Sequence, residues 1–102
     1  MANKKVDFNQ IVGTASPVLV DFHATWCSPC KALAPVIKEV KKDVGDKMRI
    51  IKIDIDKNKA LAHKYKVQSV PTLAIFKYGK IIWRESGMKT KGQLVKLIKQ
   101  YS

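Results

Sequence analysis

The sequence predicts an α/β fold in which a central mixed β-sheet is flanked by helices. Short apolar runs rich in Val, Ile and Leu alternate along the chain with stretches whose apolar residues recur at helical spacing. The first such stretch lies between two apolar runs, and strand, helix, strand in this order makes the two strands parallel. With 46% hydrophobic residues, the 102-residue chain is long enough for one core, so a single domain over residues 1–102 is expected.

The first half of the chain predicts a short helix, two strands and a long helix between them. Apolar residues in 8–12 share one helical face, and residues 18–24 are apolar on both faces, as in a strand covered on both sides. Residues 29–44 have an apolar helical stripe that ends before Gly45, a common helix stop. Residues 48–54 form the second predicted strand.

The second half predicts a short helix, a hairpin and a final helix. Residues 58–65 form the short helix, and residues 72–77 and 80–85 read as strands joined by a tight turn that contains glycine. Thr90 with Gln93 three residues later is a capping box, which predicts the start of the last helix. This helix is expected to close the far side of the sheet.

The chain is strongly basic, with 20 Lys and Arg against 8 Asp and Glu and a net charge of +12. Such a charge favours acidic partners. Because the lysines are spread along the chain and no basic motif with interleaved aromatic residues is present, nucleic-acid binding is disfavoured. A lysine-rich surface that selects acidic protein substrates is the preferred interpretation.

No apolar stretch approaches the ~18–20 residues that a membrane-spanning helix needs, so no membrane partner is expected. The first residues carry lysines without a following apolar segment of the kind that directs export. A cytoplasmic location is therefore expected.

The two cysteines, Cys27 and Cys30, sit in one four-residue window, where a bridge closes a loop too small to stabilise the fold much. Cys27 falls where a strand meets a helix, and helix N-termini favour thiolates. With Ser28 as helix cap and Pro29 at the first helical position, Cys27 is expected to be the more exposed of the pair. That asymmetry suits two-step thiol-disulfide exchange.

Two other interpretations of the cysteine pair remain open. The pair could be half of a zinc site with His23 and His63, although the spacing matches no zinc finger. It could also be a structural disulfide without a chemical role.

The segment from Val20 to Lys31 resembles the active-site segment of thioredoxins, and Cys-x-x-Cys near a strand–helix–strand pattern is typical of that family. Further matches follow in order along the chain: Asp21, Trp26, Pro35, Lys52, Val70-Pro71-Thr72, Gly79 and Gly87. The resemblance covers roughly residues 17–102. Before it, the chain is short for the family's opening strand, which is expected to be reduced or missing.

The resemblance implies a role for each matching residue. Cys27 is the attacking cysteine and Cys30 the resolving one. Asp21 is the buried acid that takes the proton of Cys30, since burial raises the pKa of a carboxyl group. Lys52, expected on the neighbouring strand, modulates that acid. Residues bordering a shallow substrate groove are Trp26, Ser69, Val70, Pro71 as a cis-proline, Gly87 and Met88.

The resemblance also implies a thioredoxin-like fold without a bound metal or organic cofactor, whose redox group is the Cys27–Cys30 disulfide. An NADPH-dependent thioredoxin reductase recycles the pair, so NADPH acts only through that partner. The substrates are protein disulfides, and the chain is expected to be monomeric.

Two departures from the family bear on tuning of the redox site. Ser28 stands where the family most often has Gly, and the two residues between the cysteines, Ser28 and Pro29, tune the balance of dithiol and disulfide. His23 replaces a more usual large aromatic residue, and strand alternation places it on the face of Asp21, where an imidazole could add a titration near neutral pH.

The sequence therefore predicts a protein-disulfide reductase. One alternative keeps the fold but makes the chain an oxidant or isomerase of an oxidising compartment. The other is a basic binding module with incidental cysteines.

Overall fold

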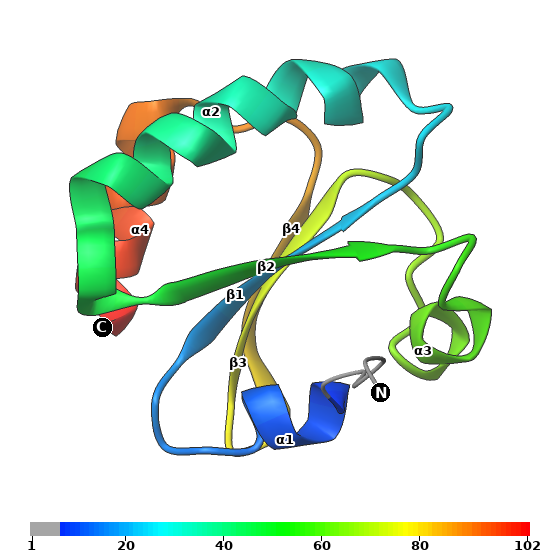
Figure 1. Cartoon of the computed structure of the whole chain (residues 1–102), viewed down its shortest axis with the longest axis horizontal. Coiled ribbons are helices and arrows are strands. Elements are labelled where there is room, and N and C mark those ends of the chain that lie inside the picture. The colour runs from blue at the N-terminus through cyan, green and yellow to red at the C-terminus, as the bar shows by residue number, and fades with distance from the viewer. Residues whose placement is uncertain (1–6) are drawn as a thin grey trace, which may run out of the picture.

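The computed structural model describes residues 7–102 as a four-stranded sheet with helices on both faces, which confirms the predicted α/β class (Figure 1). In chain order the elements are α1 (Phe8–Val12), β1 (Val18–His23), α2 (Ser28–Val44), a short 3-10 helix η1 (Gly45–Lys47), β2 (Arg49–Asp54), α3 (Lys59–Lys64), β3 (Thr72–Lys77), β4 (Lys80–Ser86) and α4 (Lys91–Tyr101). Every element expected from the sequence between residues 8 and 101 is present.

The sheet is mixed, as predicted, with the strand order β2-β1-β3-β4. β1 pairs with β2 in parallel and with β3 in antiparallel orientation. β3 and β4 form the predicted hairpin, whose turn residues Tyr78 and Gly79 both have positive φ, 53° and 77°. That backbone conformation matches the twist of the strands on either side.

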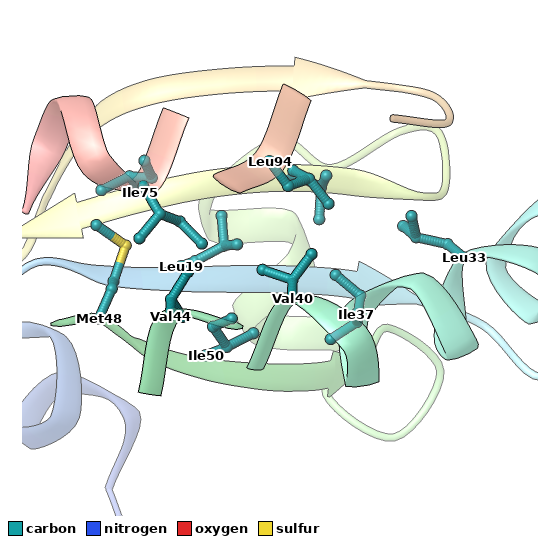
Figure 2. Close-up of a cluster of buried hydrophobic side chains, with 11 residues drawn as sticks. Leu19, Leu33, Ile37, Val40, Val44, Met48, Ile50, Ile75 and Leu94 are labelled. Carbon is teal, nitrogen blue, oxygen red and sulfur yellow. The ribbon is translucent and has the colours of Figure 1, made fainter. Parts of the chain in front are cut away.

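One face of the sheet is covered by α2 and α4 together, and the opposite face by α1 and α3 (Figure 1). Leu19 of β1 and Ile75 of β3 point toward α2 and α4, where they pack with Val40 and Leu94 (Figure 2). Val20 and the other alternate residues of β1 point the opposite way, into a second apolar cluster with Val12 of α1. Both faces of β1 are thus buried, as its sequence predicts.

The expectation that the last helix closes the far side of the sheet is wrong, because α4 lies beside α2. The reason is the apolar surface of β3. Leu73 and Ile75 share the face of Leu19, and α4 covers them with Leu94 and Ile98. The opposite face has its own cover in α1 and α3.

The opening strand was expected to be reduced or missing. Residues 7–17 contain helix α1 and no strand, while residues 1–6 lie outside the described part of the chain. Among residues 7–102, no helix is both long and apolar enough to cross a membrane.

Candidate functional site

Cys27 and Cys30 form a disulfide across the first turn of α2, with their Cα atoms 5.2 Å apart. β1 ends at His23, and a tight turn follows in which the backbone N–H of Cys27 donates to the carbonyl of Ala24. Pro29 occupies the first turn of α2, where a missing N–H costs no helical hydrogen bond. The fold thus places the pair just beyond the carboxyl end of a central strand.

The cap of α2 differs from the prediction. Cys27, not Ser28, is the N-cap residue, and its Sγ accepts the backbone N–H of Cys30 at 3.1 Å. Ser28 is the first residue of the helix and is exposed. Serine is the better cap by statistics, so the sequence favoured it, but only Cys27 has the extended backbone that a cap needs.

Cys27 is also not the more exposed cysteine, since 4% of Cys27 and 6% of Cys30 is accessible. Its Sγ turns back over the helix and lies 3.5 Å from the carbonyl oxygen of Val70. Ala24, Ile55 and Val70 pack around the pair. The shielding comes from a segment 43 residues away, which no local pattern reveals.

Asp21 is buried on β1, as predicted, with 2% of its surface accessible. Burial raises the pKa of its carboxyl group above the ordinary 3.8, while the charges of His23 and Lys52 partly lower it. Its Oδ1 has no hydrogen-bond partner. Lys52 faces Asp21 in the parallel pairing of β1 and β2 but is itself exposed.

The turn before β3 carries the expected cis peptide bond between Val70 and Pro71. The carbonyl of Pro71 accepts the backbone N–H of Gly87 at 2.9 Å, which ties this turn to the end of β4. Thr72 donates to the carbonyl of Ser69 at 2.6 Å. The structure therefore brings four of the predicted groove residues next to Cys27 or to one another: Ser69, Val70, Pro71 and Gly87.

Trp26 and Met88 are large exposed side chains, at 66% and 45% accessibility. The indole Nε1 of Trp26 donates to Asp56 at 2.8 Å, which leaves the ring on the surface rather than in the core. The sequence did not predict Asp56 as part of the site. It lies 30 residues away, in a loop, and its only signal was that an indole N–H needs an acceptor.

A pocket of about 230 Å³ lies beside the buried side of the cysteine pair. It is lined by His23, Ala24, Thr25, Cys30, Lys31, Ala34 and Lys52. The pocket joins three residues that the sequence singled out separately, His23, Cys30 and Lys52. Residues 7–102 contain no group of three or more His, Cys, Asp or Glu that could hold a metal ion, so the zinc hypothesis has no ligand set there.

Comparison with known proteins agrees with this geometry. The family model described as Thioredoxin matches residues 1–100. A thioredoxin-like protein of Synechocystis is 39% identical over 104 residues, covering 99% of either chain, and the thioredoxin of Bacillus subtilis is 45% identical over 84 residues, covering 82% of this chain and 81% of its own. The crystal structure of a Malassezia sympodialis thioredoxin matches 92% of this chain and 82% of its own, with a TM-score of 0.85 and 34% identity.

Replacing Asp21 by Asn is expected to stabilise the fold at neutral pH by about 1–3 kcal/mol, because the amide keeps the shape of the side chain but leaves no charge to bury. Because burial raises the pKa of Asp21, the folded state disfavours the carboxylate that the unfolded chain carries freely. The penalty is therefore fully present above the folded-state pKa and vanishes below the ordinary value of 3.8.

Urea unfolding of the oxidised Asp21→Asn variant and the unchanged protein between pH 3.5 and 8 measures this difference. The gain should shrink steadily as the pH falls. Asp46→Asn, at an exposed position, is the control and should change stability by less than about 0.5 kcal/mol. An equal gain in the free energy of unfolding at every pH would show that the raised pKa of Asp21 is not its cause.

Proposed function

The chain belongs to the thioredoxin family, and from that premise we propose which residues carry each step of its reaction. Its activity is the family's dithiol-disulfide exchange, and the redox group is the Cys27–Cys30 pair. The observation that carries the proposal is the hydrogen bond from the backbone N–H of Cys30 to Cys27 Sγ, which marks Cys27 as the sulfur that the helix N-terminus stabilises as a thiolate.

In the first step the Cys27 thiolate attacks a sulfur of the substrate disulfide. A bond forms between Cys27 and that sulfur, the substrate S–S bond breaks, and the second substrate sulfur leaves as a thiolate that takes a proton from water. The N–H of Cys30 and the start of α2 lower the energy of the attacking thiolate. The product is a mixed disulfide.

In the second step Cys30 resolves the mixed disulfide. Its thiol gives its proton to the carboxylate of Asp21, its sulfur attacks Cys27, and the bond between Cys27 and the substrate breaks. The raised pKa of Asp21 supports this role, because a carboxylate with a raised pKa is a stronger base. Both substrate sulfurs are then reduced, and the protein is left with the disulfide of this structure.

We further propose that substrates bind as an extended segment beside the cis-proline turn. Ser69, Val70 and Pro71 form one border, and Gly87 is tied to that border by its hydrogen bond to Pro71. The exposed side chains of Trp26 and Met88 supply apolar contact area. A substrate sulfur held there meets Cys27 next to the Val70 carbonyl.

For partners, we propose protein disulfides as substrates and an NADPH-dependent thioredoxin reductase as the source of electrons, with residues 1–102 acting as a single monomeric domain. The proposed location is the cytoplasm. It is supported by cysteine usage, since both cysteines belong to the redox pair, as is usual in reducing compartments. A rice relative, 44% identical over 82 residues, is described as chloroplastic.

Replacing Cys27 and replacing Cys30 should block different steps of the reaction. In the Cys27→Ser variant, insulin reduction by dithiothreitol is expected to proceed only at the uncatalysed rate. The reason is that a hydroxyl is not a nucleophile at neutral pH without an activating base. Cys30→Ser should still attack and should accumulate a mixed disulfide with the substrate, visible by mass spectrometry. His63→Gln, at an exposed position on α3, is the control and keeps activity. A mixed disulfide on Cys27→Ser with Cys30 attacking would reverse the assignment.

The net charge of +12 predicts a preference for acidic substrates. Between 10 and 500 mM salt, reduction of a disulfide peptide flanked by Asp and Glu should slow about tenfold, because screening shortens the reach of surface charges. A peptide flanked by Lys should not slow. Lys31→Gln, next to Cys30 and exposed, should weaken the preference more than the distant Lys99→Gln. Equal salt dependence for both peptides would exclude charge selection.

A further inference from the structure

The pocket beside Cys30 offers a route for protons between the site and solvent. Its volume of about 230 Å³ has room for several water molecules, each of which takes about 30 Å³. Cys30 and His23 both line it. His23 is half-buried, so part of it is in contact with solvent.

Asp21 needs such a route because it is buried. Only 2% of the residue is accessible, and Oδ1 has no hydrogen-bond partner among the described residues. His23 follows two residues later on the same face of β1, about 7 Å further along the strand. Its charge lowers the pKa of Asp21, which indicates that the two groups interact.

Other charged groups face His23 from the neighbouring elements. Lys52 on β2 and Lys31 on α2 line the pocket, but a lysine ammonium has no lone pair to accept a proton. Asp54 pairs with His23 in the sheet, and its Oδ1 already accepts the backbone N–H of Asp56 at 2.8 Å. Among the side chains that line the pocket, the imidazole alone has one ring nitrogen that accepts a proton and a second that releases one.

We propose that His23 relays the proton between Asp21 and solvent through this pocket. The proposal rests on the proposed role of Asp21 as the acceptor of the Cys30 proton. After that transfer the Asp21 O–H bond breaks, and the proton passes through a water molecule to one ring nitrogen of His23. The other nitrogen releases a proton to pocket water. No electrons move. Asp21 ends as the carboxylate, and His23 ends as a neutral imidazole with its proton on the other ring nitrogen, which proton exchange with pocket water reverses.

The relay predicts that His23 affects the second step and not the first. His23→Gln keeps a polar side chain of similar reach but cannot be protonated near neutral pH. Release of substrate from a preformed mixed disulfide, followed by stopped flow at pH 7, should slow at least about tenfold. Attack by Cys27, measured separately with Cys30 replaced by Ser, should keep its rate within about twofold.

Rescue of the release rate by added imidazole distinguishes a proton relay from a purely structural role of His23. Imidazole added at increasing concentration should restore the release rate of His23→Gln, because the pocket admits a small base. The unchanged protein should not respond. His63→Gln, which replaces the chain's other histidine at an exposed position on α3, is the matched control and should match the unchanged protein. His23→Asn serves as the second substitution, with folding checked by circular dichroism.

The Asp21→Asn variant distinguishes the relay by His23 from the proposed role of Asp21 as acceptor of the Cys30 proton. If Asp21→Asn slows release while both His23 variants keep the normal rate, or slow without responding to imidazole, the relay is overturned and Asp21 remains the acceptor. If Asp21→Asn releases substrate at the normal rate, the proposed role of Asp21 fails and the relay fails with it. Slow release in Asp21→Asn and His23→Gln, with imidazole rescue only in the latter, is the result that the relay predicts.

Discussion

The hydrogen bond from the backbone N–H of Cys30 to Cys27 Sγ is the interaction on which the rest of the site depends. It exists only because α2 begins directly after Cys27, so that the sulfur caps the helix instead of a serine hydroxyl. The unpaired N–H groups of that first turn favour negative charge. This backbone geometry is the basis of the proposed role of Cys27 as the nucleophile.

The pairing of the strands positions the residues of the site that lie outside α2. Phe22 of β1 pairs with Thr72 of β3, and this antiparallel register brings the Val70–Pro71 turn to the end of β1 where the cysteines lie. The carbonyl of Val70 then lies over Cys27 Sγ. On the other side, the parallel pairing of Asp21 with Lys52 sets a buried acid and an exposed cation on adjacent strands. The redox pair therefore has the proposed substrate border on one side and the proposed proton acceptor on the other.

The sequence predicted much of this arrangement because the signals were local. The apolar residues on both faces of β1 predicted that Asp21 is buried, and the Thr90 capping box predicted the start of α4. What it missed depends on long-range packing. Apolar side chains of β3 decide which face of the sheet α4 covers, and Val70 decides the burial of Cys27. The contact between Trp26 and Asp56 likewise joins two loops that no periodic pattern connects.

The measurement that tests the central claim most directly is the reduction potential of the Cys27–Cys30 pair. The protein is equilibrated in thiol-disulfide buffers of graded potential, and free thiols are counted by alkylation and mass spectrometry. A potential of about −270 mV is the predicted result, since it makes the chain a donor of electrons to protein disulfides in a reducing compartment. A potential between about −180 and −120 mV would contradict the account, because a pair that oxidising is suited to isomerase or oxidant chemistry.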